Sequence, residues 1–388
     1  MSKKSSSHVD GVINSLAKRA QESFPGAKYA AVYSHTEKKM IFIPLSEAIT
    51  SQFSHATDYG SGVFEGSSAL VHERTGMPNI VLHEARMNRM FQRSLPSRGY
   101  AAPVSQQAMS DATLELIKMH GLDLFKHPDK TKDELVRAYV RPTVQPAGLG
   151  GYGINMRKDY PIDAGIVAWA WPDYLAPSLA IDGGVCAITG HQRLFAITGK
   201  HSSNYGAAVE NGKIARGLGA DELIYLAPYL IDKGGHQYWA DPKDQKAKLR
   251  DGVISDGPGE ECVAISADQR TLIYTPMRTN RLGGTTLQYV IDHLAAKIDL
   301  KTKEADITLH DLRAGKYSAL AMVGNAVKVT PMRQVDLYDE NLKLVETIPL
   351  FDKGQIPEML QTLMDRWSEE TRGVIDPSHP SLLTPVEL

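Results

Sequence analysis

A stretch that contains a proline and paired glycines, DYLAPSLAIDGG at 173–184, separates two parts of the sequence that each carry their own apolar runs. Proline and glycine interrupt regular structure. In addition, 388 residues exceed the size at which one hydrophobic core usually keeps growing. We therefore predict a small N-terminal α/β domain over 1–174, an interdomain loop over 175–183 and a larger C-terminal domain over 184–388.

The spacing of apolar residues predicts a mixture of strands and helices, with most strands before residue 200. Strands are expected at 28–34, 40–45, 63–72, 79–85, 135–145, 163–171, 184–190, 222–228, 262–266, 271–276, 319–324 and 326–331. Helices are expected at 9–23, 84–97, 105–121, 204–219, 287–298 and 357–371. The polar stretch 229–250 is interpreted as an inserted surface loop.

The composition argues against several classes of protein. Lys and Arg number 43 against 45 Asp and Glu, so the net charge of -2 provides no general attraction for nucleic acid or an anionic membrane. Cys186 and Cys262 stand in apolar, strand-like contexts, which favours reduced core thiols over a disulfide. No apolar segment follows the N-terminal lysines and no later run is long enough to span a bilayer, so we expect a cytoplasmic protein.

Two motifs with possible chemistry fail on their context. GLGGYG at 148–153 has the Gly-x-Gly-x-x-Gly spacing of dinucleotide-binding loops, but INMRKDYP behind it is no helix start, so we interpret it as a Gly-rich loop. The 13 histidines include no pair at i,i+4 and no Cys/His cluster, so no metal site is expected. No Gly-x-Ser-x-Gly elbow accompanies a credible triad either.

The segment GKHSSNYGAA at 199–208 places Lys200 in a loop of small residues directly before a predicted helix. Such a lysine is usually a solvated surface residue. Only a desolvated lysine with a lowered pKa is a good imine-forming nucleophile. Both interpretations are open from these residues alone.

Seven segments, taken in order, resemble the fold-type IV pyridoxal-phosphate enzymes and, within them, the branched-chain aminotransferases. They are DYGSGVFEG at 58–66, HEARMNRM at 83–90, YVRPTVQPAGLGGYG at 139–153, KHSSNY at 200–205, DGPGEE at 256–261, LGGTT at 282–286 and GNAVKVTP at 324–331. Each is weak alone. Their common order carries the resemblance, which extends from about Thr57 to Asp336.

The resemblance implies a class IV aminotransferase of two-domain, α+β, D-amino acid aminotransferase-like architecture, with pyridoxal 5'-phosphate between the domains. Lys200 would carry the cofactor as a Schiff base and move a proton to and from the substrate. Arg89 would hold the phosphate, because a planar guanidinium can pair with two oxygens at once. Thr285 and Thr286 would add donors at a helix start, where simple N-capping is the alternative.

Three further residues are implied to contact the cofactor. Asp256 stands where the family places a glutamate beside the pyridine nitrogen, and Tyr205 would hydrogen-bond the phenolic oxygen. Asn325 replaces a phosphate-binding threonine, and Glu261 stands where asparagine is usual. These departures put the exact substrate in doubt more than the cofactor.

The resemblance also implies a substrate pocket and a dimer. Matching positions are Tyr59, Phe64, Gly66, Tyr139, Arg141, Tyr174 and Ala326. Tyr59 would reach across the interface of a homodimer, while Tyr139 and backbone N–H groups near Asn325 and Ala326 would receive the α-carboxylate. Core packing is the alternative for each aromatic residue taken alone.

The implied reaction moves the amino group of Leu, Ile or Val to 2-oxoglutarate, so the expected partners are amino acids and 2-oxo acids. A D-amino-acid aminotransferase or an aminodeoxychorismate lyase-like enzyme is the alternative within the family. A non-catalytic relative and a dinucleotide-dependent dehydrogenase are alternatives outside it. Tyr-x-Arg-Pro beside the Gly-rich segment favours the branched-chain type, and the presence of Lys200 and Arg89 argues against a non-catalytic relative.

Overall fold

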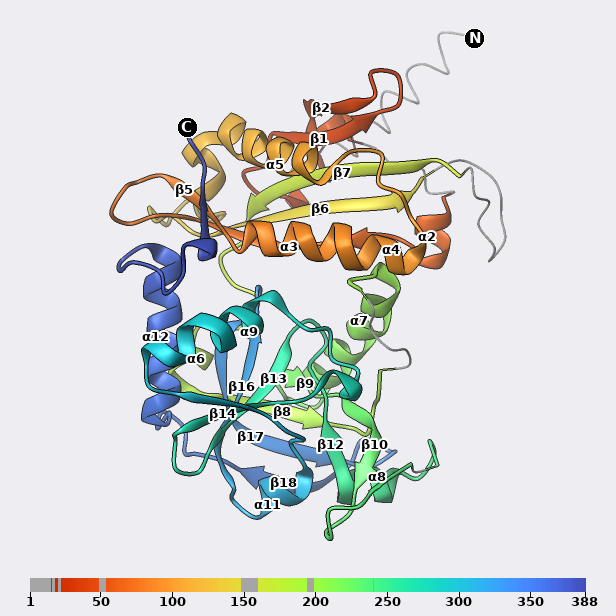
Figure 1. The fold of residues 1–388 in the computed structure, drawn as a ribbon, viewed down its shortest axis with the longest axis vertical. Coiled ribbons are helices and arrows are strands. Elements are labelled where there is room, and N and C mark those ends of the chain that lie inside the picture. Colours follow the sequence, from red (N-terminus) through yellow and green to blue (C-terminus); the bar gives the residue numbers. More distant parts are fainter. Residues whose placement is uncertain are drawn as a thin grey trace.

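The computed structural model describes residues 15, 18–19, 22–48, 54–147, 160–193, 199–239 and 241–388. Over these residues two large sheets, each with its own helices, occupy opposite halves of the molecule (Figure 1). The predicted helix at 9–23 lies largely outside the described residues, and the Gly-rich segment at 148–153 lies wholly outside them. The expected α+β class is confirmed.

The N-terminal sheet, as far as the structure describes it, is antiparallel, with the order β19-β5-β4-β6-β7-β1-β2 and β3 paired to β6. Its strands are β1 (Tyr29–Ser34), β2 (Lys39–Pro44), β3 (Val63–Phe64), β4 (Ser67–Val71), β5 (Pro78–Val81), β6 (Ala138–Pro146), β7 (Ile162–Ala170) and β19 (Leu383–Pro385). The strands expected at 28–34 and 40–45 pair as the hairpin β1–β2, and those expected at 63–72 and 79–85 pair as β4–β5. Strand β19 arrives from the far end of the chain and pairs with β5.

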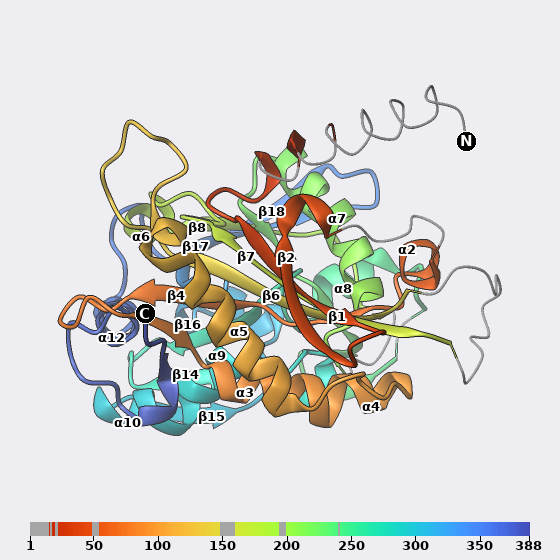
Figure 2. The same ribbon diagram turned by 90° about the horizontal axis from the view of Figure 1, so that it is seen from above.

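Helices cover the N-terminal sheet where the sequence predicted them. A helical run starts as α3 (His83–Arg89), passes through a π-helical turn at Met90–Ser94 and ends as α4 (Leu95–Arg98). The next helix is α5 (Gln106–His120), and it packs across β1, β6 and β7 (Figure 2). Each fully buried apolar side chain in this core contributes about 1.5–3 kcal/mol. The short helix α2 (His55–Tyr59) precedes β3.

The C-terminal sheet, within the described residues, is mixed, with the order β15-β14-β13-β16-β17-β8-β9 and β18 paired to β17. Its strands are β8 (Gly184–Ile188), β9 (Glu222–Leu223), β13 (Glu261–Ser266), β14 (Thr271–Tyr274), β15 (Lys301–Glu304), β16 (Tyr317–Gly324), β17 (Lys328–Tyr338) and β18 (Leu344–Pro349). Its helices are α6 (Leu179–Asp182), α7 (Ser202–Gly217), α9 (Thr285–Tyr289), α10 (Ala295–Lys297), α11 (Leu309–Arg313) and α12 (Glu358–Arg372). A π-helical turn at Val290–Leu294 joins α9 to α10, so the predicted helix at 287–298 is one continuous run.

The interpretation of 229–250 as a surface loop is wrong in part. Strands β10 (Leu226–Ile231) and β11 (Gln237–Tyr238) pair within a small separate sheet that also contains β12 (Gly252–Ile254). Helix α8 (Gln245–Asp251) lies between β11 and β12 in sequence. Asp244 caps α8 by accepting a hydrogen bond from the Ala247 N–H at 2.9 Å. Strand β11 and helix α8 are short and mostly polar in sequence, so they lack the periodic apolar positions on which the prediction depended.

The two halves meet along the helical run α3–α4. Figure 1 places this run on the side of the N-terminal sheet that faces α7 and α9. None of the helices that the structure describes has the length and apolar character needed to cross a membrane. Cys186 and Cys262 are buried in one core of the C-terminal half, and both are unpaired.

Candidate active site

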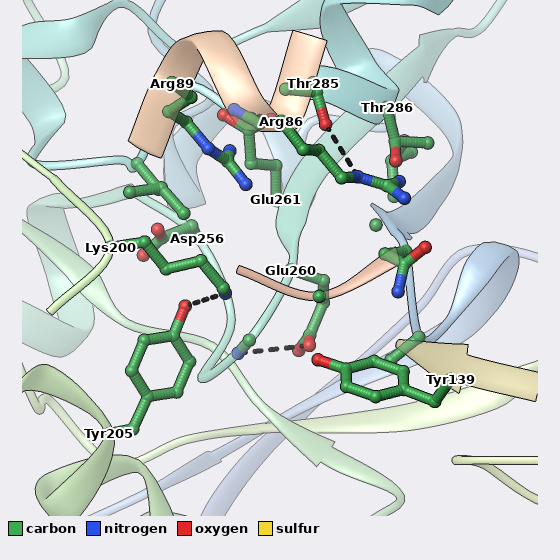
Figure 3. A pocket seen from close by; sticks show the side chains of 18 of the residues that line it. Arg86, Arg89, Tyr139, Lys200, Tyr205, Asp256, Glu260, Glu261, Thr285 and Thr286 are labelled. Carbon is green, nitrogen blue, oxygen red and sulfur yellow. Dashed lines mark hydrogen bonds between the residues drawn. The ribbon is translucent and has the colours of Figure 1, made fainter. Parts of the chain in front are cut away.

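A cavity of about 580 Å³ lies where the two halves meet (Figure 3). Ten of the residues singled out in the sequence line it: Gly66, Arg89, Tyr139, Lys200, Tyr205, Asp256, Thr285, Thr286, Asn325 and Ala326. They come from distant parts of the chain, and the helical run α3–α4, the start of α7, the turn before β13 and the end of β16 bring them together.

Lys200 lies in the wall of this cavity rather than on the outer surface of the protein. It is only 9% exposed, and its Nζ donates a hydrogen bond to the Tyr205 Oη at 2.5 Å. The ring of Phe64 lies 4.9 Å from the same nitrogen. Burial lowers the pKa of Lys200 to about 8. The interpretation of Lys200 as a solvated surface residue is therefore wrong.

The main chain at Lys200 is anchored to the helical run α3–α4. The Lys200 N–H donates to the Ser94 Oγ at 3.0 Å, and the neighbouring His201 Nε2 lies 2.8 Å from the Ser97 Oγ. The π-helical turn at Met90–Ser94 inserts one residue into the usual spacing, which changes the faces presented by Arg89 and Ser94. The helix that carries Arg89 therefore also fixes the start of α7.

Asp256 lies in the turn before β13, and its two carboxylate oxygens differ in their hydrogen bonding. Its Oδ1 accepts a hydrogen bond from the Arg193 Nε at 2.8 Å, while its buried Oδ2 has no hydrogen-bond partner. Burial raises the pKa of Asp256 to about 6, and Arg193 opposes that rise. The sequence analysis missed Arg193, because no local pattern marks a residue seven positions before Lys200.

A second buried acid, Glu260, lines the same side of the cavity. Its Oε2 accepts from the Gly259 N–H at 3.1 Å, and its Oε1 has no hydrogen-bond partner. Burial and the nearby Glu222 raise the pKa of Glu260 well above its ordinary value, and burial also raises the pKa of Glu222. Both are thus held toward the neutral form. Glu260 belongs to the DGPGEE segment, but the sequence assigned it no role.

The opposite side of the cavity carries two arginines from α3. Arg89 donates from Nε and from Nη2 to the two carboxylate oxygens of the fully buried Glu65, both at 2.7 Å. Arg86 donates from Nη1 to the Val81 carbonyl at 2.7 Å and from Nε to the Thr285 Oγ1 at 3.3 Å. The sequence analysis missed Arg86, although its position three residues before Arg89 places both on one helix face.

Glu261, one of the three departures from the family pattern, lies under the loop at 282–286. Its carboxylate accepts from the Arg281 Nη1 at 2.5 Å and from the Gly284 N–H at 2.8 Å. It therefore holds the loop that presents Thr285 and Thr286 to the cavity.

The chain is similar in sequence and in fold to known proteins. No protein-family model matches the chain. A curated protein of Pseudomonas aeruginosa named branched-chain-amino-acid aminotransferase is 25% identical over 296 residues, which cover 75% of this chain and 81% of the relative. The structure of the branched-chain aminotransferase from Thermoproteus uzoniensis with norvaline has a TM-score of 0.69 at 19% identity, over 93% of this chain and 100% of the other. The Escherichia coli enzyme has a TM-score of 0.68 at 20% identity, over 93% and 100%.

The chain is a relative of the branched-chain aminotransferases and has their fold. The family resemblance inferred from the seven segments is thereby confirmed, as is the fold-type IV architecture. The likeness favours an aminotransferase over a dinucleotide-dependent dehydrogenase.

Three of the residues matched to the aminotransferase substrate pocket, Gly66, Tyr139 and Ala326, line the cavity, and Arg141 and Phe64 pack against residues that line it. A side-chain carbon at Gly66 would lie 1.8 Å from the Tyr139 Oη, so only glycine fits beside that hydroxyl. Arg141 does not line the cavity, but it donates to the Tyr139 Oη at 3.2 Å and lies over the Phe64 ring. Phe64 in turn contacts the Tyr205 ring edge-on.

Two other aromatic residues matched to the aminotransferase pocket lie outside the set that lines the cavity. Tyr174 donates a hydrogen bond to the Glu222 Oε2 at 3.3 Å, so it reaches the acid next to Glu260. Tyr59 is 42% exposed at the end of α2, and its ring packs on His55. In the described part of the chain no group of three or more His, Cys, Asp or Glu side chains could hold a metal ion.

Proposed function

We propose that this protein is a pyridoxal-phosphate-dependent aminotransferase that moves the amino group of the branched-chain L-amino acids Leu, Ile and Val to 2-oxoglutarate. The observation that carries the proposal is that the amine of Lys200 is buried and has a lowered pKa. The same cavity holds the two arginines of α3 and the Asp256 carboxylate, of which only one oxygen is hydrogen-bonded. The names of the relatives support the same activity.

The residues of the cavity fit pyridoxal 5'-phosphate. Four buried polar atoms there have no hydrogen-bond partner: Asp256 Oδ2, Glu260 Oε1, Arg86 Nη2 and Asn325 Nδ2. A carboxylate oxygen is suited to a protonated ring nitrogen, and guanidinium and amide donors are suited to a phosphate. When bound, pyridoxal phosphate supplies an aldehyde carbon and an electron-withdrawing ring. Related structures contain pyridoxamine 5'-phosphate and N-(5'-phosphopyridoxyl)-L-glutamate.

Lys200 would act as nucleophile and then as base. With a pKa of about 8, about one tenth of the Nζ is neutral at pH 7, against about one part in three thousand at the ordinary value of 10.5. The neutral Nζ can attack a carbonyl carbon, and once released it can take a proton from the substrate α-carbon. Tyr205 keeps the Nζ in place, and burial raises the pKa of that phenol to about 12, so it stays protonated.

Asp256 would hold the ring nitrogen in its protonated form. Since its pKa is about 6, the carboxylate is largely ionised at neutral pH, and Arg193 fixes its Oδ1 so that Oδ2 faces the cavity. Glu260, held toward the neutral form, adds little second negative charge there. The hydrogen bond from Arg193 supports the proposal that the shorter aspartate would take the role of the family's glutamate.

The absorption spectrum of the protein reconstituted with pyridoxal phosphate tests the proposal. We expect a visible band that depends on Lys200, is bleached by L-leucine and returns on addition of 2-oxoglutarate, and that the Lys200→Ala variant lacks. Bleaching by D-alanine but not by L-leucine would support the D-amino-acid alternative. No band in the wild-type protein would leave the non-catalytic relative as the better description.

We further propose a homodimer, in which the exposed Tyr59 of α2 completes the partner's pocket as the resemblance implies. The division into 1–174, 175–183 and 184–388, and a cytoplasmic location, are proposed on the sequence pattern and on the unpaired Cys186 and Cys262. Light scattering of the purified protein tests the dimer, because a monomer that retains full activity excludes a shared pocket.

A further inference from the structure

The two arginines of α3 stand at the same side of the cavity, but their guanidinium groups are used differently. Arg89 has its Nε and Nη2 on Glu65, and its Nη1 lies 3.4 Å from the Gly283 carbonyl. Every nitrogen of its guanidinium therefore has a partner. Arg86 is 1% exposed, and its Nη2 has no hydrogen-bond partner.

Arg86 also lacks a paired counter-ion. No carboxylate among the described residues forms an ion pair with it, whereas Glu65 is committed to Arg89. Burial, followed by the charge of Arg89, lowers the pKa of Arg86 to about 10, so the group stays charged at neutral pH. A buried cation without a partner is costly, and an anionic ligand would remove that cost.

The surroundings of Arg86 supply further donors. In Figure 3 its side chain extends toward Thr285 and Thr286. The Asn325 Oδ1 accepts a hydrogen bond from the Ser68 N–H at 2.9 Å, which assigns the amide and leaves its buried Nδ2 without a partner in the cavity wall. Guanidinium, amide and hydroxyl groups therefore surround one end of the cavity.

We propose that Arg86, together with the Nδ2 of Asn325, binds the phosphate dianion of the ligand, and that Arg89 remains paired with Glu65. This inference rests on the proposed function, and it departs from the expectation that Arg89 is the phosphate anchor. Asn325 replaces the phosphate-binding threonine that is usual in the family. Arg86, which lies on the same helix as Arg89, compensates with a second guanidinium. Arg89 is then a positioning residue that holds Glu65 and the loop at Gly283.

The dissociation constants of the apo-protein for pyridoxal 5'-phosphate and for pyridoxal, measured by absorbance titration, test this proposal. A hydrogen-bonded charge in a buried site is worth enough that Arg86→Gln should weaken pyridoxal 5'-phosphate binding about ten- to a hundredfold. Pyridoxal lacks the phosphate, so its binding should change by less than about twofold, within the scatter of a surface substitution. Arg86→Lys, which keeps the charge but not the fork, should fall between.

Two controls separate this outcome from a folding defect. Arg74→Gln removes a surface arginine that pairs with the exposed Asp376, and it should leave both constants unchanged. Binding of inorganic phosphate, followed by calorimetry, should be lost in Arg86→Gln and kept in Arg74→Gln. Equal weakening of pyridoxal 5'-phosphate and pyridoxal in Arg86→Gln, or no weakening of either, overturns the proposal.

The failure of this inference is distinguishable from failure of the proposed function. If the wild-type protein captures pyridoxal phosphate and transaminates, but Arg86→Gln binds it as tightly, only the role of Arg86 is overturned. If the wild-type protein binds neither pyridoxal 5'-phosphate nor inorganic phosphate, both proposals fail together.

Discussion

The arginine end and the carboxylate end of the cavity both bury charge, but they accommodate it in different ways. At the arginine end, Arg89 is neutralised by an internal partner, Glu65, while Arg86 keeps its charge without one. At the carboxylate end, Asp256 shares one oxygen with Arg193, and Glu260 is held toward the neutral form by burial. Each end therefore contains one ion pair and one further ionisable group, which stays charged in Arg86 and is held toward the neutral form in Glu260.

The difference shows what kind of ligand would complete the cavity. Each end retains a buried polar atom without a hydrogen bond, and such an atom costs roughly 1–3 kcal/mol. The free atom at the arginine end is a donor on a cation, whereas the free Asp256 Oδ2 is an acceptor. A molecule with an anion at one end and an N–H donor at the other satisfies both, with Lys200 between them.

The largest expected effect comes from breaking the carboxylate end. Asp256→Asn should slow the leucine half-reaction on the order of 10²–10³-fold, because loss of one preorganised electrostatic group costs about that much. Capture of pyridoxal phosphate by Lys200 should persist. Stopped-flow absorbance in a single turnover measures both steps.

The matched control at this position is Asp256→Glu, which retains a carboxylate and should keep most of the rate. If the Asp256→Asn variant turns over at the wild-type rate, the carboxylate end takes no part in the reaction.

A second prediction concerns the buried amine between the two ends. Lys200 has a pKa of about 8 in the folded protein and 10.5 when exposed, so the unfolded chain binds more protons between these values. Below pH 8 the buried amine therefore destabilises the apo-protein by up to about 3 kcal/mol. Lys200→Met should recover most of this in urea unfolding at pH 7, and the gain should vanish as the pH rises through 10.5.

A pH-independent gain for Lys200→Met would instead assign the effect to packing. The same variant unfolded at pH 7 and at pH 10 supplies the comparison, since the methionine itself does not titrate.

A third prediction concerns how the rate of cofactor capture changes with pH as the amine of Lys200 loses its proton. The neutral fraction of Lys200 should rise from about one tenth at pH 7 to about nine tenths at pH 9, so the rate of cofactor capture should rise about ninefold and then level off. Rapid-mixing absorbance at several pH values measures it. A rate that keeps rising to pH 10.5 would place Lys200 in water rather than in the cavity wall.

The smallest expected effect tests whether the helical run α3–α4 keeps the arginine end and the carboxylate end of the cavity in their relative positions. His201→Ala removes the contact with Ser97, while Lys200 keeps its own hydrogen bond to Ser94. We expect a loss of a few-fold in capture rate, in line with about 1 kcal/mol for one hydrogen bond, and little change in affinity for inorganic phosphate. His201→Gln, which can still reach a hydroxyl, should restore the rate.

Local sequence patterns predicted most of the helices and strands, but they did not predict which distant strands pair with each other. The hairpins β1–β2, β4–β5 and β13–β14 are formed by neighbours in sequence, so their turns and apolar runs were sufficient. The pairing of β19 with β5 joins segments about three hundred residues apart, and no local signal records it. The elements inside 229–250 were missed because their polar composition resembles that of a loop.

The same division applies to the cavity. The resemblance identified Lys200, Arg89 and Asp256 because their neighbours in sequence form motifs. Arg193 and Glu222 lie in no such motif, and Arg86 lies in HEARMNRM at 83–90 but received no role there, because the importance of all three depends on what they face.

The sequence by itself determined the types of element, their order, and which side chains could carry imine and phosphate chemistry, because these properties depend on residues close together in the chain. Only the tertiary structure decided the charge state and availability of each group. Burial lowered the pKa of the Lys200 amine, and pairing with Glu65 occupied Arg89 while the Arg86 Nη2 kept no hydrogen-bond partner. Desolvation and ion pairing act through space, so they depend on neighbours that the order of residues does not reveal.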